Sequence, residues 1–256
     1  MYKFDLSQEE AEKIFKEMII PQTTATIKPS LKKEAFILGG QPGSGKSAFA
    51  REILKTNQNM VFINGDDLRA YHPQYYFYLK DNDIEAADLT QTVCNFWIEE
   101  LVNECIKKNL NFIIEGTMRK IEGPLKTAQE ASRNGYVLNL AVISTPYELS
   151  LFSLDYRYRE VKKISGFARY TKKESHDEAY RNIENTLQKL SDSRLFEKFF
   201  IYKRFAGGFE EYIFSASEKE ALLKTFREGR ERLVDEKEKE ILKFKNNFNT
   251  EIKIKK

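Results

Sequence analysis

The sequence predicts an α/β fold, a three-layer sandwich in which helices cover both faces of a mostly parallel sheet. Two observations lead to this prediction. Short apolar runs alternate with helical patterns between residues 35 and 143, as in chains that form parallel sheets. The glycine-rich segment GQPGSGKS, residues 40–47, lies between the first apolar run and the next helical pattern. The predicted class is therefore P-loop NTPase-like, with a long charged helix near the C-terminal end.

The individual elements follow in chain order. Ser7-Gln8-Glu9-Glu10 matches a capping box, which predicts a helix that ends before Pro21. An unbroken apolar run predicts a strand at 35–38, and predominantly apolar runs predict strands at 60–63, 111–114 and 136–143. Helical spacing of apolar residues predicts helices at 46–56, 84–108 and about 122–133. Beyond residue 145 the pattern is mostly helical, with candidate strands at 199–203 and 211–214.

Composition limits the classes of function. With 42 Lys and Arg against 39 Asp and Glu, the net charge of +3 is too small to indicate nucleic acid or an anionic membrane as the main partner. No apolar run approaches the ~18 residues that cross a bilayer, and residues 1–20 lack the apolar core of a secretory signal. Cys94 and Cys105 would lie about 16 Å apart in one helix, too far to bridge, which fits a reducing compartment. We expect a soluble cytoplasmic protein with no nucleic-acid and no membrane partner.

The glycine-rich segment matches G-x-x-x-x-G-K-[ST] in full. Its residues are Gly40, Gln41, Pro42, Gly43, Ser44, Gly45, Lys46 and Ser47. Glycines let backbone N–H groups wrap phosphates, Lys46 supplies a positive charge for the β and γ oxygens, and the Ser47 hydroxyl can ligate Mg²⁺. The motif predicts a nucleoside triphosphate site and leaves hydrolysis, switching and transfer all open.

Carboxylates follow the second and third predicted strands. A phosphoryl-transfer enzyme gains from a carboxylate near the acceptor hydroxyl, and parallel sheets place ligands at the carboxyl ends of their strands. Asp66 in Asn64-Gly65-Asp66-Asp67 is therefore our candidate general base, although Asp66 or Asp67 could instead cap the next helix. Glu115 could order water around Mg²⁺ or bind acceptor hydroxyls, or serve in a cap or salt bridge.

Arginines follow where lid elements would be expected. They lie in Tyr156-Arg157-Tyr158-Arg159 and in Ala168-Arg169-Tyr170. Arginine suits forked contacts to phosphate oxygens. Any one of them, and Arg119 as well, could equally be a surface residue.

Four motifs in this order and at these separations resemble the zeta-toxin family. They are GQPGSGKS, NGDDLRAYHP, IIEGTMR, and RY with a following ARYTKKESHD, and the resemblance covers roughly residues 15–205. It implies an ATP- and Mg²⁺-dependent kinase that phosphorylates UDP-N-acetylglucosamine on the 3′-hydroxyl of its amino sugar and so inhibits cell-wall synthesis. It also implies a cognate antitoxin that blocks the nucleotide site.

The resemblance implies a role for each matching residue. Asp66 would deprotonate the sugar hydroxyl, and Lys46, Arg157 and Arg169 would act on the ATP phosphates. The substrate-binding set would be Asp66, Asp67, Glu99, Glu115, Thr117, Arg119 and Thr127. Glu99 and Thr127 enter this set by position along their helices alone. Whether Arg157 or Arg159 contacts the transferred phosphate stays open.

The chain is thereby divided into two parts. Residues 1–215 are expected to form the P-loop kinase domain, with helical lid elements at about 145–195. Residues 216–256 are expected to form a charged helix, from Ser217 to about Asn247 with an interruption at Gly229, and a frayed tail. Two other functions are compatible with the sequence: a nucleotide-dependent switch or binding module, and a P-loop kinase with another hydroxyl acceptor.

Overall fold

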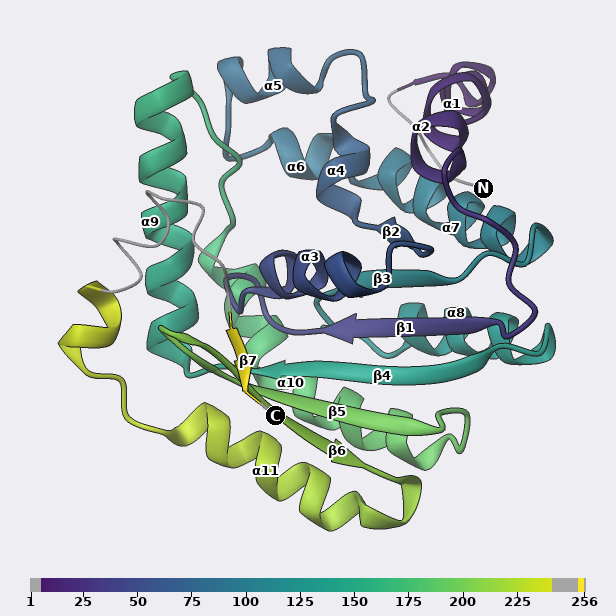
Figure 1. Ribbon diagram of the computed structural model, residues 1–256. Helices are drawn as coiled ribbons and strands as arrows, with labels where there is room; N and C mark the ends of the chain where they lie inside the picture. Colours follow the sequence, from purple (N-terminus) through teal and green to yellow (C-terminus); the bar gives the residue numbers. More distant parts are fainter. Residues whose placement is uncertain (1–5, 241–252, 256) are drawn as a thin grey trace.

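The computed structural model describes residues 6–240 and the backbone of residues 253–255, and confirms the predicted α/β class (Figure 1). The strands are β1 Glu34–Gly39, β2 Val61–Ile63, β3 Phe112–Gly116, β4 Val137–Ser144, β5 Lys198–Phe205, β6 Gly208–Phe214 and β7 Lys253–Lys255. The longer helices are α3 Lys46–Thr56, α7 Gln91–Lys107, α8 Glu122–Arg133, α9 Tyr147–Ser165, α10 Lys173–Asp192 and α11 Lys219–Glu231. The shorter ones are α1 Gln8–Ile14, α2 Ile20–Thr24, α4 Gly65–Arg69, α5 Tyr75–Asp81 and α6 Ala86–Leu89.

The strands form one sheet in the order β2-β3-β1-β4-β5-β6-β7, and all neighbours are parallel except β5 and β6. Strand β1 lies centrally between β3 and β4, with Gly39 opposite both Gly116 and Val142. The segments that follow β1, β2, β3 and β4 therefore leave the sheet at the same edge, which is where a parallel sheet places its ligand site.

Two cores, one on each face of the sheet, produce the three layers. On one face, Leu38, Ile113 and Ala141 pack with Phe49 of α3. On the other face, inward residues of the same strands, such as Ile37, pack with α7, α8, α10 and α11. The alternation along each strand and the unbroken apolar runs follow from burial of both faces.

Two helix boundaries predicted from the sequence were wrong. The first helix does not end before Pro21: α1 passes through a π-helical turn, Phe15–Ile19, into α2, which contains Pro21. The helix predicted at 84–108 is divided at Thr90 into α6 and α7, since the buried Arg69 donates to the carbonyl of Ala87 and to the Thr90 hydroxyl, both at 2.8 Å.

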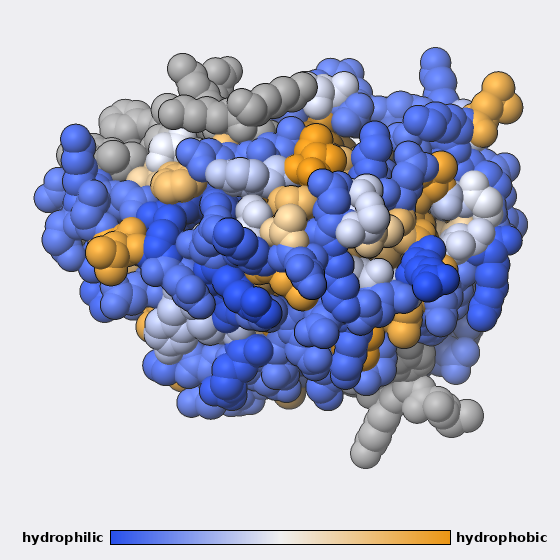
Figure 2. Space-filling model, turned by 90° about the horizontal axis from the view of Figure 1, so that it is seen from below, coloured by the Kyte–Doolittle hydropathy of each residue, from blue (hydrophilic) through white to orange (hydrophobic). Residues whose placement is uncertain are grey.

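The C-terminal charged helix also differs from the prediction. Helix α11 ends at Glu231, residues 236–240 are again helical, and the predicted remainder to 247 lies outside the described residues. Leu222 and Phe226 are buried against the sheet, while the surface on the α11 side is mostly hydrophilic with separate hydrophobic spots (Figure 2). The tail is not wholly frayed, because Lys253–Lys255 pairs with β6 as strand β7.

Gly229 does not interrupt α11 but lies buried within it. A Cβ there would meet the Ser144 Oγ at 2.4 Å and its Cβ at 2.9 Å, so only glycine lets the helix approach β4 this closely.

We expect Gly229→Ala to lower the free energy of unfolding by about 1 to 3 kcal/mol, because overpacking outweighs the better helix propensity of alanine. Gly123→Ala is the matched control: Gly123 is also helical, but its added Cβ would meet nothing within 4 Å. Chemical denaturation of both variants checks the prediction, which is wrong if Gly229→Ala is as stable as Gly123→Ala.

Candidate functional site

The phosphate loop runs from the end of β1 to the start of α3 at Lys46, in the strand–loop–helix context predicted from the motif. Gly43 and Gly45 have φ angles of 77° and 95°, in the left-handed region that favours glycine. A Cβ on Gly43 would also meet the backbone carbonyl oxygen of Ser150 at 2.1 Å. Gly43 is therefore required both by its backbone conformation and by the close approach of α9, and Gly45 by its backbone conformation.

Lys46 folds back over this loop. Its Nζ donates to the carbonyl oxygens of Gly40 at 2.7 Å and Gln41 at 3.1 Å, and lies 4.0 Å from Glu115 Oε1. Burial lowers the pKa of Lys46, and the negative charges of Glu115 and Asp66 oppose this effect. The ammonium group is thus held at the loop by carbonyl oxygens.

A cluster of oxygen atoms lies at the start of α3. The Ser47 hydroxyl donates to Glu115 Oε2 at 2.9 Å, and Asn64 Nδ2 donates to the same carboxylate oxygen at 3.0 Å. Burial raises the pKa of Glu115, although Lys46 and Ser47 act to lower it. A hydroxyl and a carboxylate in contact are oxygen ligands of the kind Mg²⁺ accepts. Within the described part of the chain, no group of three or more His, Cys, Asp or Glu side chains could hold a metal ion.

Asn64 was missed by the sequence analysis, and it determines the orientation of Asp66. The backbone N–H of Asp66 donates to Asn64 Oδ1 at 2.8 Å, so Asn64 caps α4. The alternative in which Asp66 caps this helix is therefore wrong. The signal was available in the sequence, since Asn directly after a strand and before Gly-Asp is a preferred N-cap.

The Asp66 carboxylate lies among arginines. Its Oδ2 is 3.0 Å from Arg169 Nη1 and its Oδ1 is 3.7 Å from Arg69 Nε. Burial acts to raise the pKa of Asp66, but the charges of Arg169, Arg69, Arg157 and Lys46 outweigh it and hold the pKa below its usual value. Asp66 is thus ionised at neutral pH. Asp67 is exposed on the same short helix.

The two arginines that follow Tyr156 and Tyr158 face different surroundings. Arg157 is near enough to Asp66 and Lys46 for its charge to influence the pKa of both. Arg159 instead pairs with Asp155 at 3.0 Å on the surface of α9, and its side chain is 68% exposed. Both side chains are exposed, but only Arg157 lies close enough to Asp66 and Lys46 to affect them electrostatically.

Arg69 was also unassigned, although it lies within a quoted motif. It is 4% exposed and, besides its bonds to Ala87 and Thr90, donates to Gln91 Oε1 at 2.6 Å. It joins α4 to the start of α7 and so holds the helix that carries Asp66.

A pocket of about 310 Å³ adjoins Glu115. Glu99 and Thr127, predicted from helix position alone, both line it, and Glu99 pairs with Lys126 at 2.8 Å. Thr117 and Arg119 do not line it: Arg119 pairs with Glu178 of α10 at 3.4 Å, and Thr117 lies in the segment between β3 and α8. The structure thus brings together Glu99, Glu115 and Thr127 and leaves Thr117 and Arg119 outside the lining.

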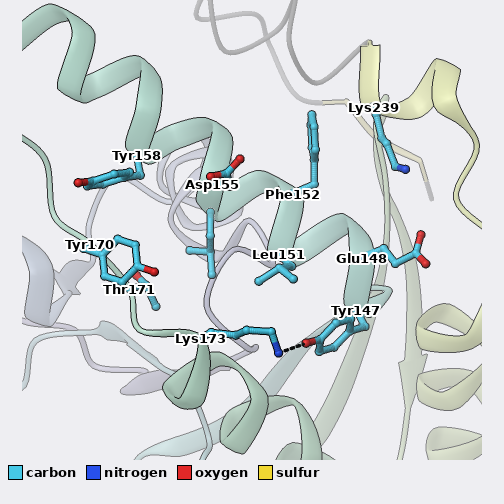
Figure 3. A pocket seen from close by; sticks show the side chains of 11 residues that line it. Tyr147, Glu148, Leu151, Phe152, Asp155, Tyr158, Tyr170, Thr171, Lys173 and Lys239 are labelled. Atoms are coloured by element: carbon cyan, nitrogen blue, oxygen red, sulfur yellow. Dashed lines mark hydrogen bonds between the residues drawn. The ribbon is translucent and has the colours of Figure 1, made fainter. Parts of the chain in front are cut away.

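A larger pocket of about 610 Å³ lies along α9, and none of the predicted site residues lines it. Figure 3 shows aromatic and apolar side chains of α9, such as Tyr158 and Leu151, facing Tyr170 and Lys173, with Lys239 at the edge. Lys173 Nζ donates to the Tyr147 hydroxyl at 2.9 Å. The smaller pocket is instead lined by the carboxylates of Glu99, Glu115 and Glu130, and it adjoins the phosphate loop only through Glu115, which accepts from Ser47.

Ser150, His176 and Asp177 have the connectivity of a hydrolase triad. Ser150 Oγ lies 2.8 Å from His176 Nε2, and His176 Nδ1 lies 3.1 Å from Asp177 Oδ1. Both Ser150 and His176 are fully buried, so no substrate reaches this hydroxyl. Gln41 Nε2 lies 3.3 Å from Ser150 Oγ and 2.8 Å from the carbonyl oxygen of Thr145. The group therefore anchors the phosphate loop to α9 and α10 and is no second active site.

Comparisons with known proteins show which family the chain resembles in sequence and in fold. The family model described as "Zeta toxin" matches residues 20–221. Toxin PezT of Streptococcus pneumoniae serotype 4 is 36% identical over 179 residues, which cover 69% of this chain and 71% of the relative. Toxin zeta of Enterococcus hirae is 30% identical over 172 residues, or 66% of this chain and 60% of that relative's length. A solved structure of the PezAT chromosomal toxin–antitoxin system of S. pneumoniae superposes with a TM-score of 0.77 and 28% identity, covering 96% of this chain and 97% of the other.

The charges around Asp66 lead to a prediction. We expect Arg169→Met to raise the pKa of Asp66, because it removes the nearest positive charge, whereas Arg159→Met should leave this pKa unchanged, because Arg159 pairs with Asp155. A pH titration followed by carboxyl-carbon NMR measures both variants. Equal Asp66 pKa values in the two variants would contradict the assigned ion pair.

Proposed function

The chain belongs to the zeta-toxin family, and from this premise we propose that it is a kinase that transfers the γ-phosphoryl group of ATP to the 3′-hydroxyl of the amino sugar of UDP-N-acetylglucosamine. One observation carries the proposal: the carboxylate of Asp66, paired with Arg169, and the ammonium of Lys46, bonded to the carbonyl oxygens of the loop, lie at the same edge of the sheet. A phosphoryl-transfer enzyme needs a base for the acceptor and a cation for the donor in this arrangement.

The ATP phosphates would be bound by the loop from Gly40 to Ser47. Lys46 would exchange its bonds to the loop carbonyl oxygens for bonds to phosphate oxygens, with Arg157 and Arg169 on the opposite side. Ser47 would hold Mg²⁺, with Glu115 next to it. A bound Mg²⁺ neutralises charge that develops on the β and γ oxygens.

Asp66 would take the proton of the acceptor hydroxyl. The hydroxyl O–H bond breaks, the new bond from oxygen to the γ-phosphorus forms, and the bond to the leaving ADP breaks. A carboxylate with a low pKa is a weak base. Among the positive charges that lower the pKa of Asp66, that of Arg169 has the largest effect, and this ion pair can break. When Arg169 turns from Asp66 to the triphosphate, the pKa of Asp66 rises, so ATP binding itself makes the base stronger.

The pocket of about 310 Å³ supports a small polar acceptor. Its carboxylates, Glu99 and Glu115, are acceptors for sugar hydroxyl and amide N–H groups, and Thr127 can donate or accept. Apolar neighbours such as Ile98 and Met118 provide the remaining wall. Thr117, Arg119 and Asp67 would contact the nucleotide part of the acceptor from outside this pocket.

A protein partner forms part of the proposal. The PezAT relative is described as a toxin–antitoxin system. We infer that this chain has a cognate antitoxin that occludes the nucleotide site, and that its product deprives cell-wall synthesis of UDP-N-acetylglucosamine. No helix among the described residues is long and apolar enough to cross a membrane.

The direct test is incubation of the protein with ATP, Mg²⁺ and UDP-N-acetylglucosamine, with the products separated by chromatography and identified by mass. We expect the sugar nucleotide to gain one phosphate. Other UDP-sugars and free aminosugars serve as competing acceptors. If only ADP and inorganic phosphate form, or if another acceptor is strongly preferred, the proposed reaction is wrong.

We expect Asp66→Asn to lower kcat by about a hundredfold or more while ATP binding is retained, since the amide cannot accept the proton. Asp192→Asn is the control, because Asp192 is a surface carboxylate paired with Lys219 of α11. Steady-state kinetics and nucleotide titration measure both. Full turnover in Asp66→Asn would rule out Asp66 as the base.

A further inference from the structure

Arg204 is a buried charge that the proposed reaction does not use. It lies near the end of β5 and is 8% exposed. Its guanidinium donates to the carbonyl oxygen of Gly43 in the phosphate loop, and through Nη2 to Ser153 Oγ of α9 at 3.0 Å. It also lies behind Gly45, where an added Cβ would come within 3.5 Å of Arg204 Nε. A residue from the far part of the chain thus contacts the outer side of the loop.

Burying the guanidinium of Arg204 is electrostatically unfavourable. Burial and the neighbouring charge of Arg232 lower the pKa of Arg204 to about 10, partly offset by Glu238, so the side chain remains charged at neutral pH. Both acceptors of its hydrogen bonds, a backbone carbonyl and a hydroxyl, are neutral. A hydrophobic residue would fill this space at less electrostatic cost, so stability alone is a poor reason for an arginine here.

We propose that Arg204 is a positioning residue for the phosphate loop, an inference that rests on the proposed nucleotide site. A peptide unit is planar, so its C=O and N–H point in opposite directions. When Arg204 holds the Gly43 carbonyl, it fixes the whole peptide unit between Gly43 and Ser44, whose N–H donates to the carbonyl oxygen of Gln41 at 3.1 Å and so closes a turn within the loop. The loop contains two glycines with positive φ and would otherwise sample many conformations. By restricting the loop before the nucleotide binds, Arg204 reduces the conformational entropy that the loop loses on binding.

The support behind Arg204 comes from the C-terminal segment. Arg232 donates through Nε to the backbone carbonyl of Arg204 at 3.1 Å and lies 4.3 Å from the ring centre of Phe205. Glu238 pairs with Arg232 at 2.6 Å and accepts from the N–H of Ala206 at 3.0 Å. Arg232 and Glu238 lie beyond the residues that the family model matches, which end at 221. Arg204 thus contacts the phosphate loop, and Arg232 in turn contacts the backbone of Arg204.

The experiment measures ATP binding to Arg204→Lys and Arg204→Met by titration of a fluorescent ATP analogue. We expect the Kd of Arg204→Met for the ATP analogue to rise about ten- to a hundredfold, because a charged hydrogen bond is lost. Arg204→Lys should recover part of the lost affinity, because its ammonium group can still donate one hydrogen bond. In turnover assays the KM for ATP should rise while the KM for the acceptor stays unchanged. Arg227→Met is the matched control, since Arg227 lies on the exposed side of α11, where it pairs with Glu184 of α10.

A merely structural role would lower the melting temperature without changing the Kd of the folded protein, and this result overturns the inference. If Arg204→Met does not fold, Arg232→Met replaces it, because it removes the outer support and leaves the buried site filled. Unchanged ATP affinity in both Arg232→Met and Arg204→Lys is then the overturning result. A wild-type chain that fails to bind ATP would instead refute the proposed function, so the two failures are distinguishable.

Discussion

The structure depends on a polar loop buried at the edge of the sheet. Gln41, Ser44 and Lys46 are all buried, and buried polar groups are costly unless they are hydrogen-bonded. The carbonyl oxygens of Gly40 and Gln41 accept from Lys46, and the Gly43 carbonyl accepts from Arg204. The segment after β4, helix α9 and strand β5 are therefore required to converge on the loop between β1 and α3.

The charges at this edge compensate one another. Lys46, Arg157 and Arg169 supply positive charge, and Asp66 and Glu115 supply negative charge, each perturbing the pKa of its neighbours. In the proposed reaction a triphosphate would enter as a strong anion and compete with these carboxylates for the cations. The carboxylates released by that exchange are those that would bind Mg²⁺ and accept a proton.

The region of family similarity and the described fold do not end together. Residues 20–221 match the family model, whereas α11 continues to Glu231 and its inner side is buried against the sheet. Gly229 permits the close approach to β4, and Arg232 follows at the point where the chain turns back toward β5. The C-terminal segment is in this way connected to the phosphate loop through Arg204.

The sequence by itself determined the features that depend on neighbouring residues. The apolar run before GQPGSGKS predicted β1, the motif predicted the loop and the start of α3, and the polar residues after two further runs located Asp66 and Glu115. These predictions succeed because parallel strands end at one edge, whatever lies between them. Only the tertiary structure assigned Asn64 as the cap, favoured Arg157 over Arg159 at the edge that carries Asp66, and brought Arg204 to Gly43. The last pair is separated by 161 residues, and no local pattern records which side chains meet when distant elements pack together.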